Sequence, residues 1–339
     1  RKECAIAMGR IRDEAVVEPL VDSLSDDDWR VREMVMKALL GVGQAGVELL
    51  ITALNDEDTA IRDRAAEVLG AIGDLRAVNA LIETVNELDA DMVSTELVEA
   101  LGFIGDARAL ETLIHLMKEG DESVRYNASR ALGNIGDSRA IKILVHALKD
   151  EDEYVRARAA EALGEIGDRR AVRGLLKAIH DPQGYVRRNI IDALGEIGDS
   201  RAIQPLIKLL KDSDTFLTYR AAMALGRIGE DAVKPLVKIL RKLPDEDTIH
   251  NVTRALGFLG DKRAVRHLLP LAEHPSYAVR QQVAWALGQT RDKRCVETLI
   301  TLLKDEVDVV QRTACEALEH INTPEANSAA QQWRKYHPD

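Results

Sequence analysis

Three features of the sequence have residue types and spacings that could support chemistry: a glycine-rich segment, two equivalent serines and a set of histidines. GVGQAG at 41–46 has the spacing of a loop that holds the phosphates of a dinucleotide. That function needs a strand before the loop and a helix that begins within it. Here the segment joins two predicted helices, so we interpret it as a turn between helix ends.

The serines and histidines give no catalytic arrangement. Ser138 and Ser200 each lie in the sequence GDSRA, and a nucleophilic serine needs a histidine and an acid to activate it. We see no such partners and predict that both serines begin helices. The histidines at 115, 146, 180, 267, 274, 320 and 337 are scattered and show no zinc-site spacing. We therefore expect no catalytic residue, no metal and no cofactor.

Composition limits the classes of partner. The formal net charge of -11 argues against a general nucleic-acid binder, because such proteins neutralise phosphates with Lys and Arg. No apolar run approaches 18 residues, so we expect no membrane span. The first ten residues, RKECAIAMGR, do not resemble a signal peptide. Three separated cysteines, Cys4, Cys295 and Cys315, fit a reducing cytoplasm.

An internal repeat positions all of these residues. ALGNIGD at 131–137 returns as ALGEIGD at 162 and 193, and then as ALGRIGE at 224, ALGFLGD at 255 and ALGQTRD at 286. The period is 31 residues, and VLGAIGD at 68 and ALGFIGD at 100 extend the series upstream. Units of this length cannot bury an apolar face alone, so they must stack to form one continuous core.

Each unit is predicted to contain two helices. When Val155 is numbered position 0, small or apolar residues fall at positions 0, 4, 7, 8 and 11, which is one face of a helix. Gly167 suits the end of this helix and Asp168 the start of the next. The second helix, RRAVRGLLKAIH, is again apolar on one side.

The segment VRARAAEALGEIGDRRAVRGLLKAI (155–179) and its copies resemble HEAT-like repeats of the phycobilisome-lyase family. The resemblance implies an all-α α-solenoid, a right-handed superhelix of about ten 31-residue HEAT-like helix pairs. We expect one repeat domain over 1–339: a partial first unit at 1–12, ten helix pairs at 13–321 and a capping helix at 322–339. The first predicted helix has apolar side chains at Cys4, Ile6 and Met8. We expect an upstream helix that covers them.

The arginine that follows position 0 is predicted to be structural, tying adjacent units through acidic groups. It occurs at Arg32, Arg62, Arg125, Arg156, Arg187 and Arg280.

The resemblance also permits two enzyme interpretations. Deoxyhypusine hydroxylase has similar repeats and places His-Glu pairs at positions 2 and 3, where they hold two irons. Those positions read Ala157-Arg158 and Gln281-Gln282 here, and His250 is the only histidine among them. One histidine cannot build that centre, which disfavours the hydroxylase activity. A cofactor-handling enzyme or chaperone similar to bilin lyase subunits, with a tetrapyrrole in a groove, remains the alternative.

Aromatic residues gather on a different face of the first helix of each unit. Positions -1, 2, 3, 6 and 10 form a stripe away from the core positions, and resemblance to HEAT solenoids implies that this stripe is concave. Random placement of the 12 aromatics would put about 1.8 of them in the stripe. It holds eight: Phe103, Tyr126, Tyr154, Tyr185, Phe216, Tyr219, Phe258 and Trp285.

Tyr, Trp and Arg dominate the energetics of protein interfaces, and the stripe mixes arginines with acidic residues, which favours a specific partner. We therefore predict a non-enzymatic scaffold that binds a protein or peptide on its concave face, with no nucleic-acid or membrane partner. The predicted contact residues are Tyr126, Arg130, Tyr154, Arg158, Tyr185, Arg188, Phe216, Tyr219, Arg220, Arg254, Phe258 and Trp285.

Overall fold

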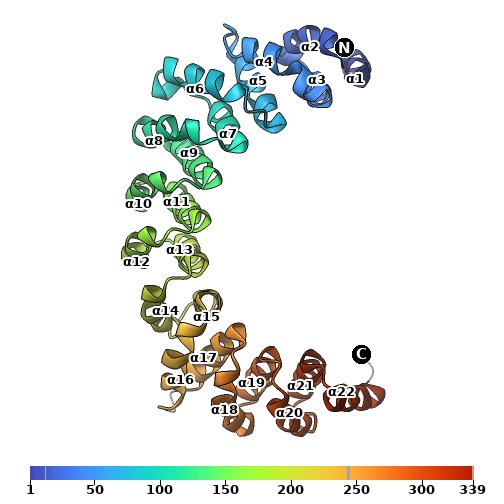
Figure 1. Cartoon of the computed structure of the whole chain (residues 1–339), viewed down its shortest axis with the longest axis vertical. Coiled ribbons are helices and arrows are strands. Elements are labelled where there is room, and N and C mark those ends of the chain that lie inside the picture. Colours follow the sequence, from blue (N-terminus) through green and yellow to red (C-terminus); the bar gives the residue numbers. More distant parts are fainter. Residues whose placement is uncertain (12, 243–244, 338–339) are drawn as a thin grey trace. The chain divides into compact units, whose positions relative to one another are not determined.

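The computed structural model describes residues 1–11, 13–242 and 245–337, and every regular element within these ranges is helical. The chain forms two compact units, Arg1–Asp168 and Arg169–Asp339. Figure 1 shows each unit as a series of short, stacked helices. The predicted all-α repeat fold is confirmed.

The described residues of the first unit form eleven α-helices. They are α1 (Lys2–Ile11), α2 (Val17–Asp22), α3 (Trp29–Val42), α4 (Val47–Ala53), α5 (Thr59–Ile72), α6 (Ala77–Glu87), α7 (Thr95–Ile104), α8 (Leu110–Glu119), α9 (Glu122–Ile135), α10 (Ile141–Ala147) and α11 (Glu153–Ile166). Its 3-10 helices are η1 (Glu14–Val16), η2 (Ser23–Ser25), η3 (Gly43–Gly46), η4 (Ala90–Met92), η5 (Ala107–Ala109) and η6 (Ser138–Ala140).

The second unit continues the same alternation. Its α-helices are α12 (Val172–Ala178), α13 (Gly184–Ile197), α14 (Ile203–Leu209), α15 (Thr215–Ile228), α16 (Val233–Leu240), α17 (Glu246–Leu259), α18 (Val265–Leu268), α19 (Tyr277–Gln289), α20 (Val296–Leu302), α21 (Asp308–Ile321) and α22 (Pro324–Tyr336). Its 3-10 helices are η7 (Arg169–Ala171), η8 (Ser200–Ala202), η9 (Glu230–Ala232), η10 (Lys262–Ala264), η11 (Leu269–Glu273) and η12 (Lys293–Cys295).

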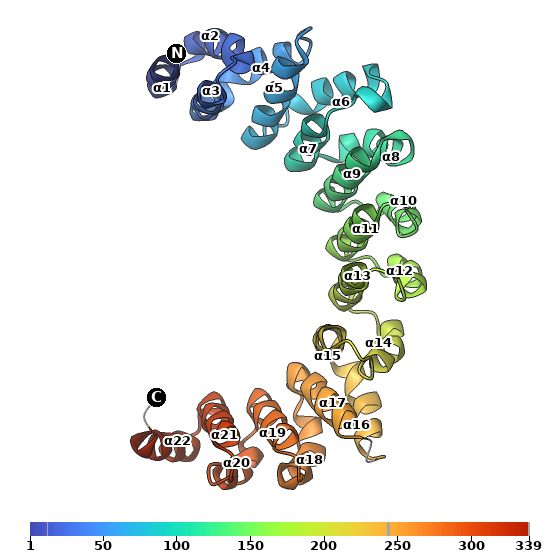
Figure 2. The same ribbon diagram turned by 180° about the vertical axis from the view of Figure 1, so that it is seen from behind.

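Two layers of helices build each unit. The odd-numbered helices, here called the first-helix layer, pack against one another in chain order, as α5, α7 and α9 do in the first unit and α15, α17 and α19 in the second. The even-numbered helices pack on the other side of them, as α14 does on α15 and α20 on α21. Figure 2 shows the two layers from behind. The stripe residues therefore belong to one layer.

The core follows the predicted pattern. Val155, Ala159, Ala162 and Leu163, at positions 0, 4, 7 and 8 of α11, are fully buried. The leucine at position 8 is at most 1% exposed in nine successive first helices: Leu69, Leu101, Leu132, Leu163, Leu194, Leu225, Leu256, Leu287 and Leu318. Burying each leucine side chain contributes about 1.5–3 kcal/mol, so the repeated leucine accounts for much of the stacking free energy.

The turns within each repeat also follow the sequence. Gly136 ends α9 in the left-handed conformation with φ 70°, and its N–H donates to the carbonyl of Leu132. Asp137 then accepts a hydrogen bond of 2.8 Å from the backbone N–H of Arg139. The second helix begins as a 3-10 turn, η6, before α10. The predicted capping roles of the repeat's Gly-Asp pair are confirmed here.

The repeated arginine ties adjacent repeats at Arg125 and Arg280, as predicted, whereas Arg62 pairs with Asp63 of its own helix. Arg125 donates two hydrogen bonds, of 2.9 and 2.8 Å, to Asp150, which precedes the next first helix. Arg280 binds Asp305 in the same way, at 2.7 and 2.9 Å. The sequence did not reveal a second role: Arg156 Nη1 also donates to the backbone carbonyl of Asp150, in the turn just before its own helix. The arginine therefore satisfies carbonyls that the preceding helix end leaves unpaired.

A glycine allows the first helices to approach closely. A Cβ added at Gly195 of α13 would lie 2.8 Å from the Cα of Ala224 in α15, and one at Gly288 of α19 would lie 2.7 Å from the Cα of Ala317 in α21. Real Cβ atoms do not come this near to backbone carbon. The glycine of each ALG motif is therefore needed for packing, which the sequence interpretation did not foresee.

One segment is long and apolar enough to cross a membrane by length and composition. It is Trp29–Ala53, with 25 residues, of which an 18-residue window has a mean hydropathy of 1.5, and the sequence interpretation did not expect it. In the fold it is two helices, α3 and α4, separated by η3, where Gly43 has φ 66°. The apolar window is 39% buried inside the protein, and core helices commonly pass the same test. The segment is thus weak evidence for a membrane span.

Candidate partner-binding face

Cross-helix ion pairs show that the stripe residues share one face of the first-helix layer. In the first unit, Arg130 at position 6 of α9 pairs with Glu99 at position 6 of α7, with 3.1 Å between nitrogen and oxygen. In the second unit, Arg220 of α15 pairs with Asp192 of α13 at 2.7 Å. Because these residues meet across neighbouring helices, the stripe is a continuous surface within each unit.

Aromatic rings form a chain along this face in the second unit. The rings of Tyr219 on α15 and Phe258 on α17 meet edge to face, with centroids 5.7 Å apart and an interplanar angle of 82°. Phe258 meets Trp285 on α19 in the same manner, at 5.1 Å and 76°. Such contacts are worth about 0.5–1.5 kcal/mol beyond burial, so the three rings hold one another in place.

Guanidinium groups lie over two aromatic rings of α15, Phe216 and Tyr219. Arg188 and Arg220 both lie over the ring of Phe216, 5.0 and 5.2 Å from its centroid. Arg254 lies 5.6 Å from the centroid of Tyr219. A cation over an aromatic ring is attracted by about 0.5–1 kcal/mol at an exposed site. Each arginine is therefore held beside an aromatic ring.

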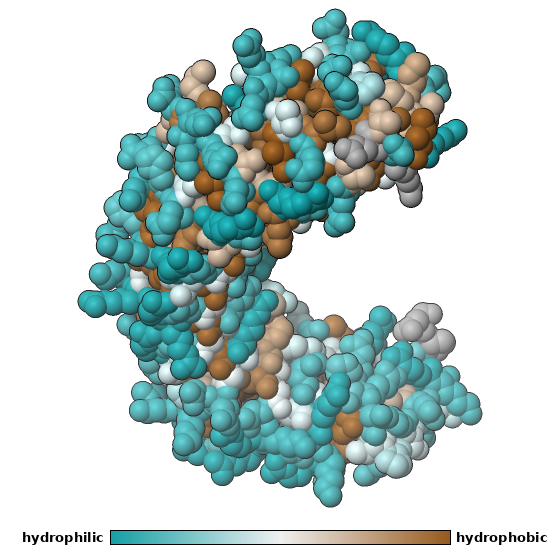
Figure 3. Space-filling view, turned by 45° about the horizontal axis from the view of Figure 1, so that its top comes forward, coloured by the Kyte–Doolittle hydropathy of each residue, from teal (hydrophilic) through white to brown (hydrophobic). Residues whose placement is uncertain are grey.

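Among the four rings on α15, α17 and α19, the two on α15 are the more accessible. Phe216 is 45% exposed and Tyr219 is 40% exposed, whereas Phe258 and Trp285 are half-buried. In the space-filling view, hydrophilic side chains cover most of the surface and apolar residues are exposed between them (Figure 3). We call Arg188, Phe216, Tyr219, Arg220, Arg254, Phe258 and Trp285 the aromatic–arginine cluster.

A histidine lies beside the cluster. Arg254 Nη2 is 2.6 Å from His250 Nε2, and because a guanidinium can only donate, the imidazole nitrogen accepts. Burial lowers the pKa of His250, and the neighbouring Arg254 lowers it further. Burial also lowers the pKa of Arg254. The histidine is thus held neutral where it orients a cluster arginine.

Glycines make room for the rings. A Cβ added at Gly257 of α17 would overlap the indole of Trp285, and one at Gly226 of α15 would lie 2.6 Å from the Cβ of Phe258. These are the ALG glycines that elsewhere face an alanine. The signal that could have revealed the contact is the presence of a large ring on the helix that follows an ALG glycine.

The first unit holds fewer of these features. Arg130 lies 5.1 Å from the centroid of Phe103, which is 58% exposed, and Tyr154 is 60% exposed. Tyr126 is half-buried. Arg158 differs from the expectation of an accessible contact residue: it is only 8% exposed, and its guanidinium pairs with Glu161 and Glu165 of its own helix. Arg158 therefore leaves little of its own surface for a ligand.

The aromatic ladder at position -1 is divided between the units. Tyr154 belongs to the first unit, and Tyr185 and Phe216 belong to α13 and α15 of the second. Tyr185 is half-buried and Phe216 is accessible. Of the two ladder residues in the second unit, Phe216 is therefore the better placed to contact a ligand.

The sites considered for other chemistry have structural roles. GVGQAG forms the end of α3 and the turn η3, with no strand before it in the described part of the chain. Ser138 and Ser200 begin the 3-10 turns η6 and η8. Among the described residues, no three His, Cys, Asp or Glu side chains are grouped so that they could hold a metal ion.

Comparisons with known families agree with the repeat. The family model for HEAT repeats matches residues 41–102, 90–153, 141–225, 217–276 and 265–335. The model for the PBS lyase HEAT-like repeat matches residues 1–26. No curated protein matches the chain.

Two solved structures have similar folds, and a third is matched with a lower TM-score. An engineered protein is similar with a TM-score of 0.52 and 25% identity, over 91% of this chain and 99% of that one. Kap95p, from a structure of its complex with RanGDP, is similar with a TM-score of 0.59 and 15% identity over 91% of this chain, which spans 49% of that chain. The CpcE–CpcF complex of phycocyanin lyase from Nostoc sp. PCC7120 matches with a TM-score of 0.36 and 22% identity, over 81% of this chain and 94% of that one.

Proposed function

The chain belongs to the HEAT-repeat family, and we propose that it is a non-enzymatic scaffold that binds a partner protein or peptide on its first-helix layer. The site is the aromatic–arginine cluster of the second unit. The proposal rests above all on Phe216, an accessible ring with the guanidinium groups of both Arg188 and Arg220 over it.

The residue types of the cluster favour a protein ligand. Tyr, Trp and Arg are the side chains whose truncation most often weakens protein interfaces, because they combine a large apolar area with directed hydrogen bonds. Phe216 and Tyr219 offer apolar area, and the arginines offer donors that suit carboxylates. Kap95p, which has a similar fold, binds RanGDP, and this supports a protein as the class of partner.

The charges around the cluster favour a specific partner over a polyanion. Asp192 pairs with Arg220, and Glu196 pairs with Arg227 at 3.7 Å on the same face. These carboxylates would repel a continuous run of phosphates, whereas a folded partner or peptide can place opposite charges against each group. We further propose a cytoplasmic location, because an odd number of separated cysteines fits a reducing compartment.

The proposal is tested by removing the accessible rings. Peptides selected from a random display library against the wild-type protein supply a ligand, and its affinity is measured by calorimetry for Phe216→Ala with Tyr219→Ala. We expect at least a tenfold loss, which is about 1.4 kcal/mol, with an unchanged helical circular dichroism spectrum. The companion variant Tyr185→Ala with Phe216→Ala is expected to lose affinity in the same direction.

The matched control is Tyr336→Ala in α22. Tyr336 is 70% exposed, and it lies at the end of the second unit, outside the cluster. This variant should bind the selected peptides as the wild type does. Equal binding by the Phe216–Tyr219 variant and the control would reject the cluster as the site. A coloured protein that carries a tetrapyrrole would instead favour a bilin-lyase-like function.

A further inference from the structure

A basic pocket lies among the even-numbered helices of the second unit, away from the aromatic–arginine cluster. Its volume is about 690 Å³, within the range of small-molecule sites. Three consecutive repeats contribute to it, through α16, through η10 with α18, and through η12. The apolar wall comes from Val233 and Val237, which are 2% and 8% exposed. The pocket is therefore a built concavity with an apolar wall.

Most of the lining is cationic. Seven of the ten lining residues are Lys or Arg, one is a histidine and none is acidic. Arg263 is neutralised by Asp261 and Glu230, and Arg294 by Asp292. The other five form no ion pair with any residue that the structure describes: Lys234, Lys238, Arg241, Lys262 and Arg266. This concentration is unusual in a chain of net charge -11.

The charge is not a general property of the repeat. The segments IQPLIKLLK (203–211) and VKPLVKILR (233–241) occupy equivalent places in α14 and α16, and Gln204 stands where α16 has Lys234. One repeat beyond α18, Glu297 occupies the place of Arg266. Lys208 and Lys211 are basic in the places of Lys238 and Arg241, so only part of the charge is particular to this junction.

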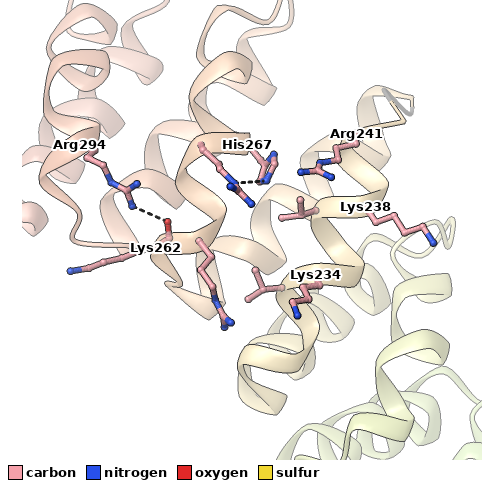
Figure 4. A pocket seen from close by; sticks show the side chains of 10 residues that line it. Lys234, Lys238, Arg241, Lys262, His267 and Arg294 are labelled. Atoms are coloured by element: carbon pink, nitrogen blue, oxygen red, sulfur yellow. Dashed lines mark hydrogen bonds between the residues drawn. The ribbon is translucent and has the colours of Figure 1, made fainter.

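The lining side chains do not all point into one space. Figure 4 shows Arg241, which follows α16, and His267 of α18 facing each other, whereas the ammonium groups of Lys238 and Lys262 point away from them. Arg294 donates a hydrogen bond of 3.2 Å to the carbonyl of Lys262. Arg266 Nε donates to His267 Nε2 at 3.0 Å. Burial lowers the pKa of His267, and the positive charges of Arg241 and Arg266 lower it further. The positive charges of Arg241 and Arg266 therefore disfavour protonation of His267.

We propose that this pocket binds a small, multiply phosphorylated ligand. Guanidinium groups bind phosphate oxygens through paired N–H donors, and lysine ammonium groups add point charges. Lys234, Arg241 and Arg266, which form no ion pair within the described part of the chain, supply positive charge for the phosphates, and the valine wall can contact an apolar part of the ligand. The pocket extends over only three repeats, and the rest of the chain is acidic. A long nucleic acid is therefore disfavoured, because most of its phosphates would lie outside the basic pocket.

Calorimetry with tripolyphosphate and with a nucleoside triphosphate tests the proposal in low-salt buffer. We expect saturable binding that weakens as salt rises, because phosphate binding releases counterions. Arg241→Gln with Arg266→Gln removes one guanidinium from each side of His267 and should weaken binding at least tenfold, which is about 1.4 kcal/mol. A separate measurement by NMR should show the pKa of His267 rising when tripolyphosphate binds.

The control variant removes two equivalent charges outside the pocket. Arg173 occupies in α12 the place of Arg266 in α18, and Lys211 follows α14 as Arg241 follows α16. Arg173→Gln with Lys211→Gln should therefore bind tripolyphosphate as the wild type does. Equal weakening by both double variants, or no saturable binding by the wild type, would overturn the proposal.

Two further arms identify the source of the phosphates. Binding to vesicles that contain a phosphoinositide, compared with vesicles of neutral lipid, shows whether the pocket accepts a lipid headgroup as well as a soluble ligand. Binding to the vesicles or to the soluble phosphate compounds supports the proposal if the Arg241–Arg266 variant loses that binding. An acidic peptide or an RNA that binds more tightly than tripolyphosphate, and loses that binding in the same variant, would contradict the assignment to small phosphorylated ligands.

Discussion

His250 and Arg254 link the charge state of one residue to the geometry of the aromatic–arginine cluster. Arg254 reaches both the imidazole of His250 and the ring of Tyr219. A protonated imidazole can no longer accept the hydrogen bond from Arg254, and it would repel that guanidinium. The position of a cluster arginine therefore depends on a neutral histidine.

This dependence predicts a sign for the effect of pH. The pKa of folded His250 is below the ordinary value of 6.5, because of burial first and Arg254 second, while Asp247 and Glu246 act in the opposite direction. The stability that comes from the neutral form is present above pH 6.5 and is lost as the pH falls through the lower folded pKa. NMR titration should give a His250 midpoint below 6.5.

The comparison variant for this titration is Arg254→Gln, which should raise the midpoint toward the ordinary value without restoring it fully, since burial remains. Wild-type protein should also lose more stability between pH 7.5 and 5.5 than His250→Gln, measured by urea unfolding. A His250 midpoint at or above 6.5 in the wild type would contradict this account of the cluster.

At the scale of elements, the first-helix layer depends on a glycine at each close approach. Gly195 of α13 faces the backbone of Ala224, whereas Gly184, at the start of the same helix, has only the end of the Arg187 side chain at 3.6 Å from an added Cβ. Alanine substitutions at these two glycines therefore separate the effect of a steric clash between helices from the effect of alanine on backbone flexibility.

Gly195→Ala should lower the free energy of unfolding by about 1–3 kcal/mol, because the added methyl group forces α13 and α15 apart. Gly184→Ala should be neutral or stabilise the protein by about 0.4–1 kcal/mol, because alanine restricts the unfolded chain. Urea unfolding of both variants measures the difference. Equal effects would show that the close approach does not limit the layer.

The sequence predicts elements better than it predicts their surfaces. The 31-residue period, the buried leucine and the Gly-Asp turns were sufficient for the order of the helices, since each repeat can bury its apolar face only against the next. The stripe was also predictable, because the helical period alone separates it from the core. Arg158 was misjudged because intrahelical pairing with Glu161 and Glu165 depends on side-chain conformation.

At the scale of the whole molecule, the sites arise from neighbouring repeats and not from single ones. The residues that line the basic pocket lie between positions 233 and 294. No local sequence motif predicts the pocket, because each lysine or arginine alone is typical of a solvated helix surface. The ring chain of Tyr219, Phe258 and Trp285 likewise needs three successive first helices. The repeated residues determine the helical stack. The candidate sites are formed where residues of adjacent repeats differ from the repeated pattern.

Photo-cross-linking tests the central claim, that the aromatic–arginine cluster contacts the partner, most directly. A photoreactive phenylalanine analogue is introduced at position 216 in one protein and at position 336 in another, and each is irradiated with the selected ligand. The account predicts a ligand-dependent cross-link from position 216, which excess unlabelled ligand abolishes, and none from position 336. A cross-link from position 336 alone, with an unchanged ligand affinity in both proteins, would contradict it.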